Sequence, residues 1–176
     1  MPQVTDLFEL EKLGLRSGEG RFFELHAAVD GFSFGGQRYD IDPSPMPVRL
    51  DISRTTHSGY AMRLRFRAAI HGPCMRCLEP AEPGFDVDVR EVFQPGGVDQ
   101  LMSPYVVEHG DLDLRAWTRD ALALTAPAQI TCRPDCAGLC PVCGVDLNDE
   151  GGRGRSHAHE AEPDPRWAKL RELKLD

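Results

Sequence analysis

The sequence predicts an α+β fold built on an antiparallel β-sheet or partial barrel, with a few short helices. Several segments alternate apolar and polar residues with the period of two that a half-buried strand requires. Only a few segments space apolar residues as a helix does, and 17 glycines and 14 prolines imply many turns. We expect residues 1–130 to form the β-rich domain, with residues 131–176 packed against it as a metal-binding segment and C-terminal helix.

The first fifty residues contain three expected strands. Residues 1–20 are ambiguous, because Leu7, Leu10 and Leu13 have helical spacing but glycines at 14, 18 and 20 interrupt a helix. The expected strands span residues 22–29, 37–41 and 48–52, with a turn at Gly35-Gly36. Three prolines at alternate positions forbid a helix and predict a loop over residues 42–47.

The clearest strand pattern spans residues 60–71, where apolar residues alternate with arginines and alanine. A second alternating run at residues 85–90 follows Cys74-Met-Arg-Cys77, so the two runs are expected to be the arms of one hairpin. If the arms fold back around residues 75–76, Arg65 faces Asp86, Arg63 faces Asp88 and Phe66 faces Phe85. Pro80 and Pro83 allow a shift of this register by one or two residues.

Two helices are expected after the hairpin. Residues 95–110 read as a loop, and Asp111 or Asp113 can then cap a helix that runs to about Thr125. Its apolar stripe consists of Leu114, Trp117, Ala121 and Leu124. Asp164-Pro165 begins the C-terminal helix, whose face carries Trp167, Leu170 and Leu173.

Composition limits the class of protein. The chain has 176 residues, 41% of them hydrophobic, which suits one domain with a core. No stretch approaches 18 apolar residues, and residues 1–6 lack the pattern of a secretory signal. We therefore expect a cytoplasmic protein without membrane contact, whose thiols stay reduced. The formal net charge of −8 argues against nucleic-acid binding driven by phosphate contacts alone.

The six cysteines are the main candidate site residues. Tetrahedral Zn²⁺ takes four soft ligands, usually as pairs two to four residues apart on tight turns. Three such pairs are present, Cys74/Cys77, Cys132/Cys136 and Cys140/Cys143. The last four cysteines fall within twelve polar positions, which is unusual for core cysteines, and Gly144 suits a tight turn. We predict structural zinc that staples the loops together, in preference to disulfides, unligated core cysteines or thiol redox catalysis.

Six cysteines leave two arrangements open. In one, a single Cys₄ site uses Cys74, Cys77 and two of the later four. In the other, Cys74, Cys77, Cys132 and Cys136 form one site, and Cys140, Cys143, His157 and His159 form a second. Alternate residues of an extended segment can present both imidazole rings to one side, although these histidines also fit a solvated tail. The isolated histidines, His26, His57, His71 and His109, fit ordinary positions.

The chain resembles the YceD family, the large ribosomal RNA subunit accumulation protein, over essentially its whole length. The resemblance is carried by Cys74-Met-Arg-Cys77-Leu-Glu-Pro80, Asp111-Leu112, Asp164-Pro165-Arg166 and, most specifically, Gly-Leu-Cys140-Pro-Val-Cys143-Gly-Val-Asp-Leu-Asn148. Many members carry Cys-x-Cys where this chain has His157-Ala-His159, which exchanges one type of zinc ligand for another. Other members keep only the Cys-x-x-Cys, which implies two separable sites.

The resemblance implies a bacterial ribosome-assembly factor that supports accumulation or processing of large-subunit (23S) ribosomal RNA. The sequence itself has no Ser/His/Asp arrangement and no phosphate-cradling glycine motif, and closed thiolate sites are structural. We therefore expect no enzymatic activity and no small-molecule substrate.

Two kinds of partner are expected. The first is large-subunit ribosomal RNA or a pre-ribosomal particle, and the candidate contacts are Arg63, Arg65, Arg67, Arg76, Arg153 and Arg155. The hairpin arginines fit pairing with Asp86 and Asp88 equally well, and the last two fit a soluble loop. The second is a basic ribosomal protein or other assembly partner held by the acidic surface.

Overall fold

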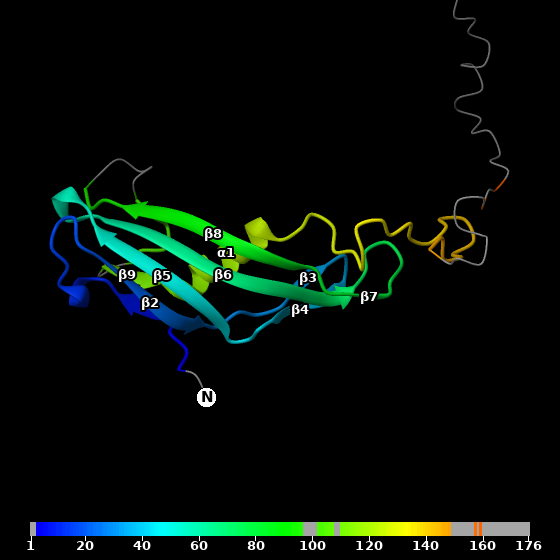
Figure 1. Ribbon diagram of the computed structural model, residues 1–176, viewed down its shortest axis with the longest axis horizontal. Coiled ribbons are helices and arrows are strands. Elements are labelled where there is room, and N and C mark those ends of the chain that lie inside the picture. Colours follow the sequence, from blue (N-terminus) through cyan, green and yellow to red (C-terminus); the bar gives the residue numbers. More distant parts are fainter. Residues whose placement is uncertain (1–2, 97–101, 108–109, 149–156, 158, 160–176) are drawn as a thin grey trace, which may run out of the picture.

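The computed structural model describes residues 3–96, 102–107, 110–148, 157 and 159. Within these residues the chain is mostly antiparallel sheet with one α-helix, as Figure 1 shows. The sheet has seven strands, and the pairings within the described residues do not close it into a barrel. The expected antiparallel sheet is thus confirmed, whereas the partial barrel is not. No described helix is both long and apolar enough to cross a membrane.

Strand β6 (Tyr60–Pro73) is the centre of the sheet because it pairs along both of its edges. One edge pairs with β8 (Gly84–Phe93) and then with β7 (Pro80–Ala81). The other edge pairs with β5 (Met46–Arg54) over its first half and with β4 (Gln37–Asp42) near its end. Outside these lie β2 (Gly20–Ala27) next to β5, and β3 (Phe32–Phe34) next to β4.

The alternation seen in the sequence separates the two faces of this sheet. In β6, Met62, Leu64 and Ile70 are buried, while the arginines between them point to the opposite face. Helix α1 (Leu114–Thr125) packs on the buried face, where Trp117 stacks on Tyr105 with ring centroids 5.9 Å apart. Asp113 caps the helix by accepting a hydrogen bond from the Ala116 N–H at 2.8 Å.

The N-terminal segment folds differently from a helix. Strand β1 (Leu7–Glu9) pairs with β9 (Asp111–Asp113), and one 3₁₀ turn, η1 (Glu11–Leu13), ends at Gly14 with φ of 58°. Leu10 between them is fully buried in the core. A second 3₁₀ turn, η2 (Thr56–Ser58), joins β5 to β6. Residues 111–113 are therefore strand, and the helix expected over 111–125 begins at Leu114.

The predicted register of the central hairpin is wrong by two residues. Arg65 lies opposite Asp88, Phe66 opposite Val87 and Arg67 opposite Asp86. The turn extends further than expected, because the Cys74 N–H donates to the Glu79 carbonyl and Pro73 pairs with Pro80. Since the shift is an even number, every side chain keeps its predicted face.

Three smaller expectations also change. The loop expected over 42–47 is shorter, since β4 ends at Asp42 and β5 begins at Met46. Leu124 is 84% exposed, and Leu122 is buried in its place. Leu122 lies one helical turn after Thr118, which is also buried, so the buried face of the helix runs through 118 and 122 rather than through 124. The C-terminal helix expected from Asp164 lies outside the described residues.

Candidate metal centres

The first cysteine pair lies at the end of the central hairpin, where β6 turns into β7. The Cys74 N–H donates to Glu79 O at 2.7 Å, the Leu78 N–H donates to Cys74 O at 3.0 Å, and the Arg76 N–H points at Cys74 Sγ at 3.4 Å. Leu78 takes a left-handed φ of 66° so that the turn can close. We call this turn, residues 74–79, the first knuckle. It holds Cys74 and Cys77 buried on the sheet.

The pair Cys132/Cys136 reaches the first knuckle from the loop after α1. Ile130, which is 1% exposed, anchors that loop, because the Met75 N–H donates to Ile130 O at 2.8 Å. The Arg76 guanidinium then donates to Cys136 O at 2.9 Å and to the Gln129 side chain at 2.8 and 3.2 Å. These contacts bring together two segments that lie more than fifty residues apart in the sequence.

The pair Cys140/Cys143 forms a second knuckle, residues 140–145, with the same hydrogen bonds. The Cys140 N–H donates to Val145 O at 2.8 Å, the Gly144 N–H to Cys140 O at 2.8 Å, and the Val142 N–H to Cys140 Sγ at 3.4 Å. Gly144 supplies the left-handed residue, with φ of 73°. Both knuckles therefore need a residue in the left-handed conformation at the same position of the turn. The first knuckle has Leu78 there, and the second has Gly144.

The eight predicted ligands gather into two groups of four. Cys74, Cys77, Cys132 and Cys136 form the first, Cys140, Cys143, His157 and His159 form the second, and the ligand atoms of each group lie within 4.8 Å of one another. In the first group, Sγ of Cys74 lies 3.8 Å from Sγ of Cys136. In the second, Cys140 Sγ lies 3.3 Å from His159 Nε2, and Cys143 Sγ lies 3.2 Å from His157 Nε2. Each group could hold one metal ion.

The two groups differ in exposure. Cys74, Cys77 and Cys136 are at most 6% exposed. In the second group Cys140 is buried and His157 is half-buried, whereas Cys143 and His159 are exposed. The first group is part of the core that the sheet and α1 build. The second lies beyond the end of the sheet (Figure 1).

The thiols of Cys74 and Cys77 have strongly unequal pKa values. Burial disfavours the Cys74 thiolate, but backbone N–H groups of Cys77 and Arg76 outweigh it and lower the Cys74 pKa to about 6. Burial raises the pKa of Cys77 to about 12. In the second group, N–H groups of Cys143 and Val142 lower the pKa of Cys140 to about 6 against the effect of burial. Ionisation of all four thiols of the first group would require a compensating cation.

Asn148 contributes to the site, although the sequence pattern assigned it no role. Its side-chain oxygen accepts from the Ala137 N–H at 2.7 Å, and its amide nitrogen donates to Asp146 Oδ1 at 2.7 Å and to Cys136 Sγ at 3.5 Å. Gly138 is a second residue of this kind, because a Cβ there would lie 2.9 Å from Arg76 O. The sequence signal that could have identified Gly138 and Asn148 is their position at the two ends of the Gly-Leu-Cys-Pro-x-Cys-Gly-x-x-Leu-Asn string.

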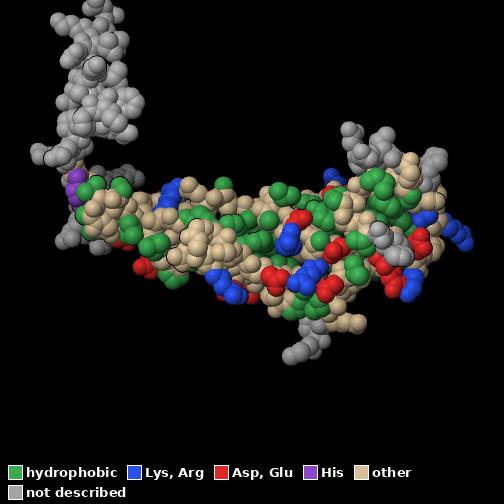
Figure 2. Space-filling model, turned by 180° about the vertical axis from the view of Figure 1, so that it is seen from behind, with side chains coloured by type: hydrophobic (Ala, Val, Ile, Leu, Met, Phe, Trp, Pro, Cys, Tyr) green, Lys and Arg blue, Asp and Glu red, His purple; other side chains and the backbone are tan. Residues whose placement is uncertain are grey.

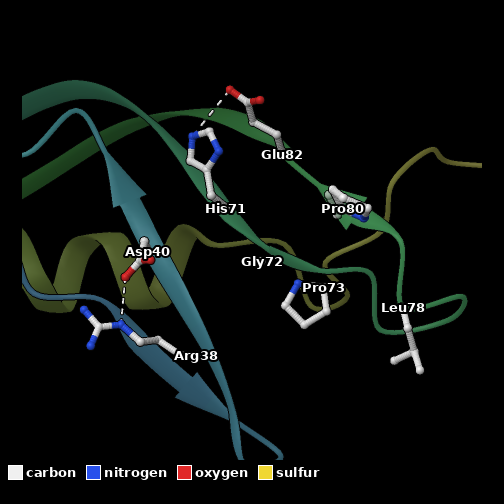
Figure 3. A pocket seen from close by; sticks show the side chains of 9 residues that line it. Arg38, Asp40, His71, Gly72, Pro73, Leu78, Pro80 and Glu82 are labelled. Atoms are coloured by element: carbon white, nitrogen blue, oxygen red, sulfur yellow. Dashed lines mark hydrogen bonds and ion pairs between the residues drawn. The ribbon is translucent and has the colours of Figure 1, made fainter.

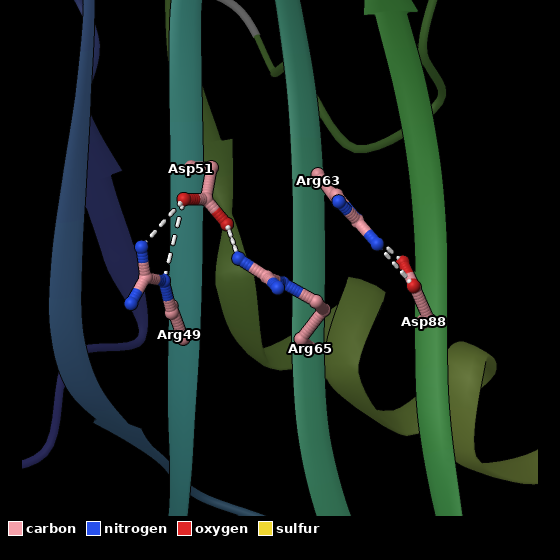
Figure 4. A network of polar contacts seen from close by, with 5 residues as sticks. All are labelled: Arg49, Asp51, Arg63, Arg65 and Asp88. Carbon is pink, nitrogen blue, oxygen red and sulfur yellow. Dashed lines mark hydrogen bonds and ion pairs between the residues drawn. The ribbon is translucent and has the colours of Figure 1, made fainter.

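Three of the six candidate RNA-contacting arginines have partners among the described residues. Arg63 pairs with Asp88 at 2.5 Å, and Arg65 pairs with Asp51 at 2.7 Å, as Figure 4 shows. Arg76 holds the cysteine loop. Arg67 is exposed, and its side chain makes no hydrogen bond or ion pair with the described residues. Arg153 and Arg155 lie outside the described residues.

An open hollow lies beside the first knuckle, between Pro73, Leu78 and Pro80 (Figure 3). Its charged side chains face each other. The Glu82 carboxylate lies 3.4 Å from His71 Nε2, and Arg38 donates to Asp40 at 2.8 Å. The polar side chains that line the hollow thus contact one another.

Comparison with known proteins identifies relatives across most of the chain. The model of the family described as "Large ribosomal RNA subunit accumulation protein YceD" matches residues 62–174. An uncharacterized protein of Mycobacterium tuberculosis (strain H37Rv) is 35% identical over 173 residues, which cover 94% of this chain and 79% of the relative. An uncharacterized protein of Mycobacterium leprae is 27% identical over 174 residues, with 95% and 76% covered.

A plant protein is also similar. The chloroplastic "Large ribosomal RNA subunit accumulation protein YCED homolog 1" of Zea mays is 28% identical over 178 residues, covering 79% of this chain and 59% of the relative. No solved structure matches the chain.

Proposed function

Because the chain belongs to the YceD family, we propose that it is a non-enzymatic ribosome-assembly factor that supports accumulation of large-subunit (23S) ribosomal RNA. The family match over residues 62–174 is the observation that carries this proposal, since it includes both knuckles and the central hairpin. The maize relative, whose name states the same role, supports it.

Two structural zinc ions complete the proposed protein, one in each group of four ligands. Thiolate and imidazole donors on tight turns suit Zn²⁺. A tetrahedral ion with sulfurs at about 2.3 Å has edges of about 3.8 Å, and the Sγ separations in the first group are 3.8 and 3.6 Å. Mixed sulfur and nitrogen ligands give edges of about 3.5 Å, close to the 3.3 and 3.2 Å of the second group.

The proposed zinc ions have a structural role and not a catalytic one. Cys74 and Cys77 of the β6 hairpin and Cys132 and Cys136 of the loop after α1 would hold one ion between them, and its charge would offset half of that of the four thiolates. Both groups supply four protein donors, so a tetrahedral ion would have no open position for water or substrate.

The partner of the protein is either RNA in the pre-ribosomal particle or a basic ribosomal protein. Arg63 and Arg65 are paired with carboxylates, and positive and negative side chains are interspersed over the face in Figure 2. Together with the net charge of −8, this pattern favours a protein partner over an extended phosphate-binding surface. Arg67 is the remaining described hairpin candidate for RNA contact.

Crosslinking in cells, followed by sequencing of the bound RNA and mass spectrometry of bound proteins, tests this proposal. We expect enrichment of large-subunit ribosomal RNA or of basic large-subunit proteins, and less large-subunit RNA when the gene is depleted. Arg67→Glu should reduce crosslinks if RNA is contacted directly, with Arg38→Glu on β4 as a control of equal charge change. Unaltered large-subunit RNA after depletion would contradict the proposal.

A further inference from the structure

The two knuckles are linked through the residues that flank the second one. Leu139, just before the second knuckle, donates its N–H to Arg76 O of the first knuckle at 3.0 Å. Gly138 packs against the same carbonyl, which leaves no room for a side chain. The Leu147 N–H donates to Gly138 O at 2.9 Å, so the strand leaving the second knuckle returns to the first.

Asn148 ends this return strand and contacts the first ligand group through its side chain. Both amide hydrogens are used, one toward Cys136 Sγ and one toward Asp146 Oδ1, and the oxygen accepts from the Ala137 N–H. Asp146 also accepts the Asn148 backbone N–H at 2.8 Å, which fixes the start of the side chain. The Asn148 side chain is therefore held in one orientation, because its oxygen and both of its amide hydrogens have partners.

We propose that Asn148 couples the two metal groups, so that metal bound at Cys140, Cys143, His157 and His159 strengthens metal binding by Cys74, Cys77, Cys132 and Cys136. This inference rests on the proposed zinc sites. Asn148 is a positioning residue here: it donates to the sulfur of Cys136 and ligates nothing itself.

Each ligand group can be metal-free or metal-bound, and the coupling follows from the difference between these two states. A hydrogen bond to a thiolate is stronger than one to a thiol, so the amide favours the ionised, metal-bound Cys136. The amide is in place only while residues 138–148 keep their hairpin, which the Leu139–Asp146 bridge and the second knuckle close. Metal at the second group holds that hairpin, and coupling between two binding sites is reciprocal.

Asn148→Asp removes the donor to Cys136 and places a second carboxylate next to Asp146, so the effect of the histidine changes is compared within each background. The aspartate keeps the shape and an oxygen to accept from Ala137, but it cannot donate to Cys136. The full-length chain would be alkylated with iodoacetamide in buffers of fixed free Zn²⁺, and the rate at each cysteine read by peptide mass spectrometry. Four proteins form a cycle: the natural chain, His157→Ala with His159→Ala, Asn148→Asp, and all three changes together.

With Asn148 present, disabling the second group should speed alkylation of Cys136 at least about fivefold, the lower end of typical couplings. In the Asn148→Asp background, the same two histidine changes should alter the rate less than about twofold. Val142→Ala, whose exposed side chain leaves the backbone donor to Cys140 intact, should behave as the natural chain does. Circular dichroism checks folding, and Asn148→Ala replaces Asn148→Asp in the cycle if the aspartate variant unfolds.

Equal acceleration in both backgrounds, or none in either, would overturn the coupling while leaving the zinc sites intact. If Zn²⁺ protects neither Cys136 nor Cys140 from alkylation in the natural chain, the proposed zinc sites themselves fail. The two failures are thus distinguished within one experiment.

Discussion

A methyl group added to Gly72 would lie 2.2 Å from Cδ1 of Tyr39. Gly72 lies two residues before Cys74, and the Tyr39 ring lies against it, with its hydroxyl donating to Pro73 O at 3.0 Å. Tyr39 is 2% exposed and belongs to the core. The end of strand β6, just before the first knuckle, is therefore held in place by the contact between Gly72 and the Tyr39 ring.

We predict that Gly72→Ala lowers the free energy of unfolding by about 1–3 kcal/mol, because the ring or the strand must move to admit the methyl group. Urea denaturation at fixed free zinc measures the effect. Gly84→Ala in β8 is the matched control, since a Cβ there has its nearest neighbour, Ala68 O, at 3.8 Å. Equal stability of the two variants would show that Tyr39 does not constrain Gly72.

The number of bound metal ions follows from the two ligand groups. We predict two zinc ions per chain by native mass spectrometry of protein purified without chelator, and one after His157→Ala with His159→Ala. Cys77→Ser should unfold the sheet or sharply lower the yield, because it removes a buried ligand. Cys143→Ser is the control, since its exposed sulfur belongs to the second group. A stoichiometry unchanged by the histidine substitutions would rule out the two-site arrangement.

The left-handed residue in each knuckle predicts opposite responses to substitution. Gly144→Ala should cost about 1 kcal/mol, because φ of 73° disfavours a side chain although space is open. This cost corresponds to roughly fivefold weaker zinc binding at the second group in a chelator competition. Leu78→Gly should leave zinc binding at the first group unchanged or tighter, since Leu78 is strained and 63% exposed. Weaker binding in Leu78→Gly would contradict this account of the knuckle.

The ion pairs of Asp51 with Arg65 and Arg49 should make a contribution to folding stability that is lost in acid. Burial disfavours its charge, but hydrogen bonds from Arg65 and Arg49 outweigh burial and lower the Asp51 pKa. A lowered folded-state pKa stabilises the protein above the unfolded value of about 3.9, and this contribution is lost as pH falls through the folded value. Asp51→Asn should therefore destabilise the protein by up to about 1 kcal/mol at pH 7, and by less as pH falls toward 3.

Denaturation curves across pH measure this difference. Asp86→Asn is the control, because Asp86 is exposed and makes no ion pair with the described residues. A difference between Asp51→Asn and the natural chain that stays constant down to pH 3 would exclude the ion pair as its cause.

Local patterns predicted the elements well where one face of a strand is buried. Alternation over residues 60–71 placed β6 and its faces correctly, because a period of two is independent of register. The register depends instead on the length of the turn. The first knuckle extends to Glu79, since Leu78 adopts a left-handed conformation that sequence patterns assign to glycine.

Contacts between distant segments were less predictable. Spacing indicated the cysteine pairs, since each pair lies on its own tight turn. It could not indicate that Asn148 reaches Cys136, because that contact depends on how the second knuckle packs against the first. Arg65 pairs with Asp51 rather than with an aspartate of β8, because β5 lies on its other side. Such choices depend on strand order, which a hairpin pattern does not contain.

The four cysteines of the first group are also synthesised at different times. A chain grows from its N-terminus, so β6 and the first knuckle leave the ribosome while Cys132 and Cys136 are still to be added. All nine described strands and helix α1 precede residue 126 in the sequence. The sheet can therefore assemble around a half-complete set of thiols. If the first group holds zinc as we propose, the metal would close a fold whose described strands are already synthesised, and zinc supply would act on a late step in the folding of this protein.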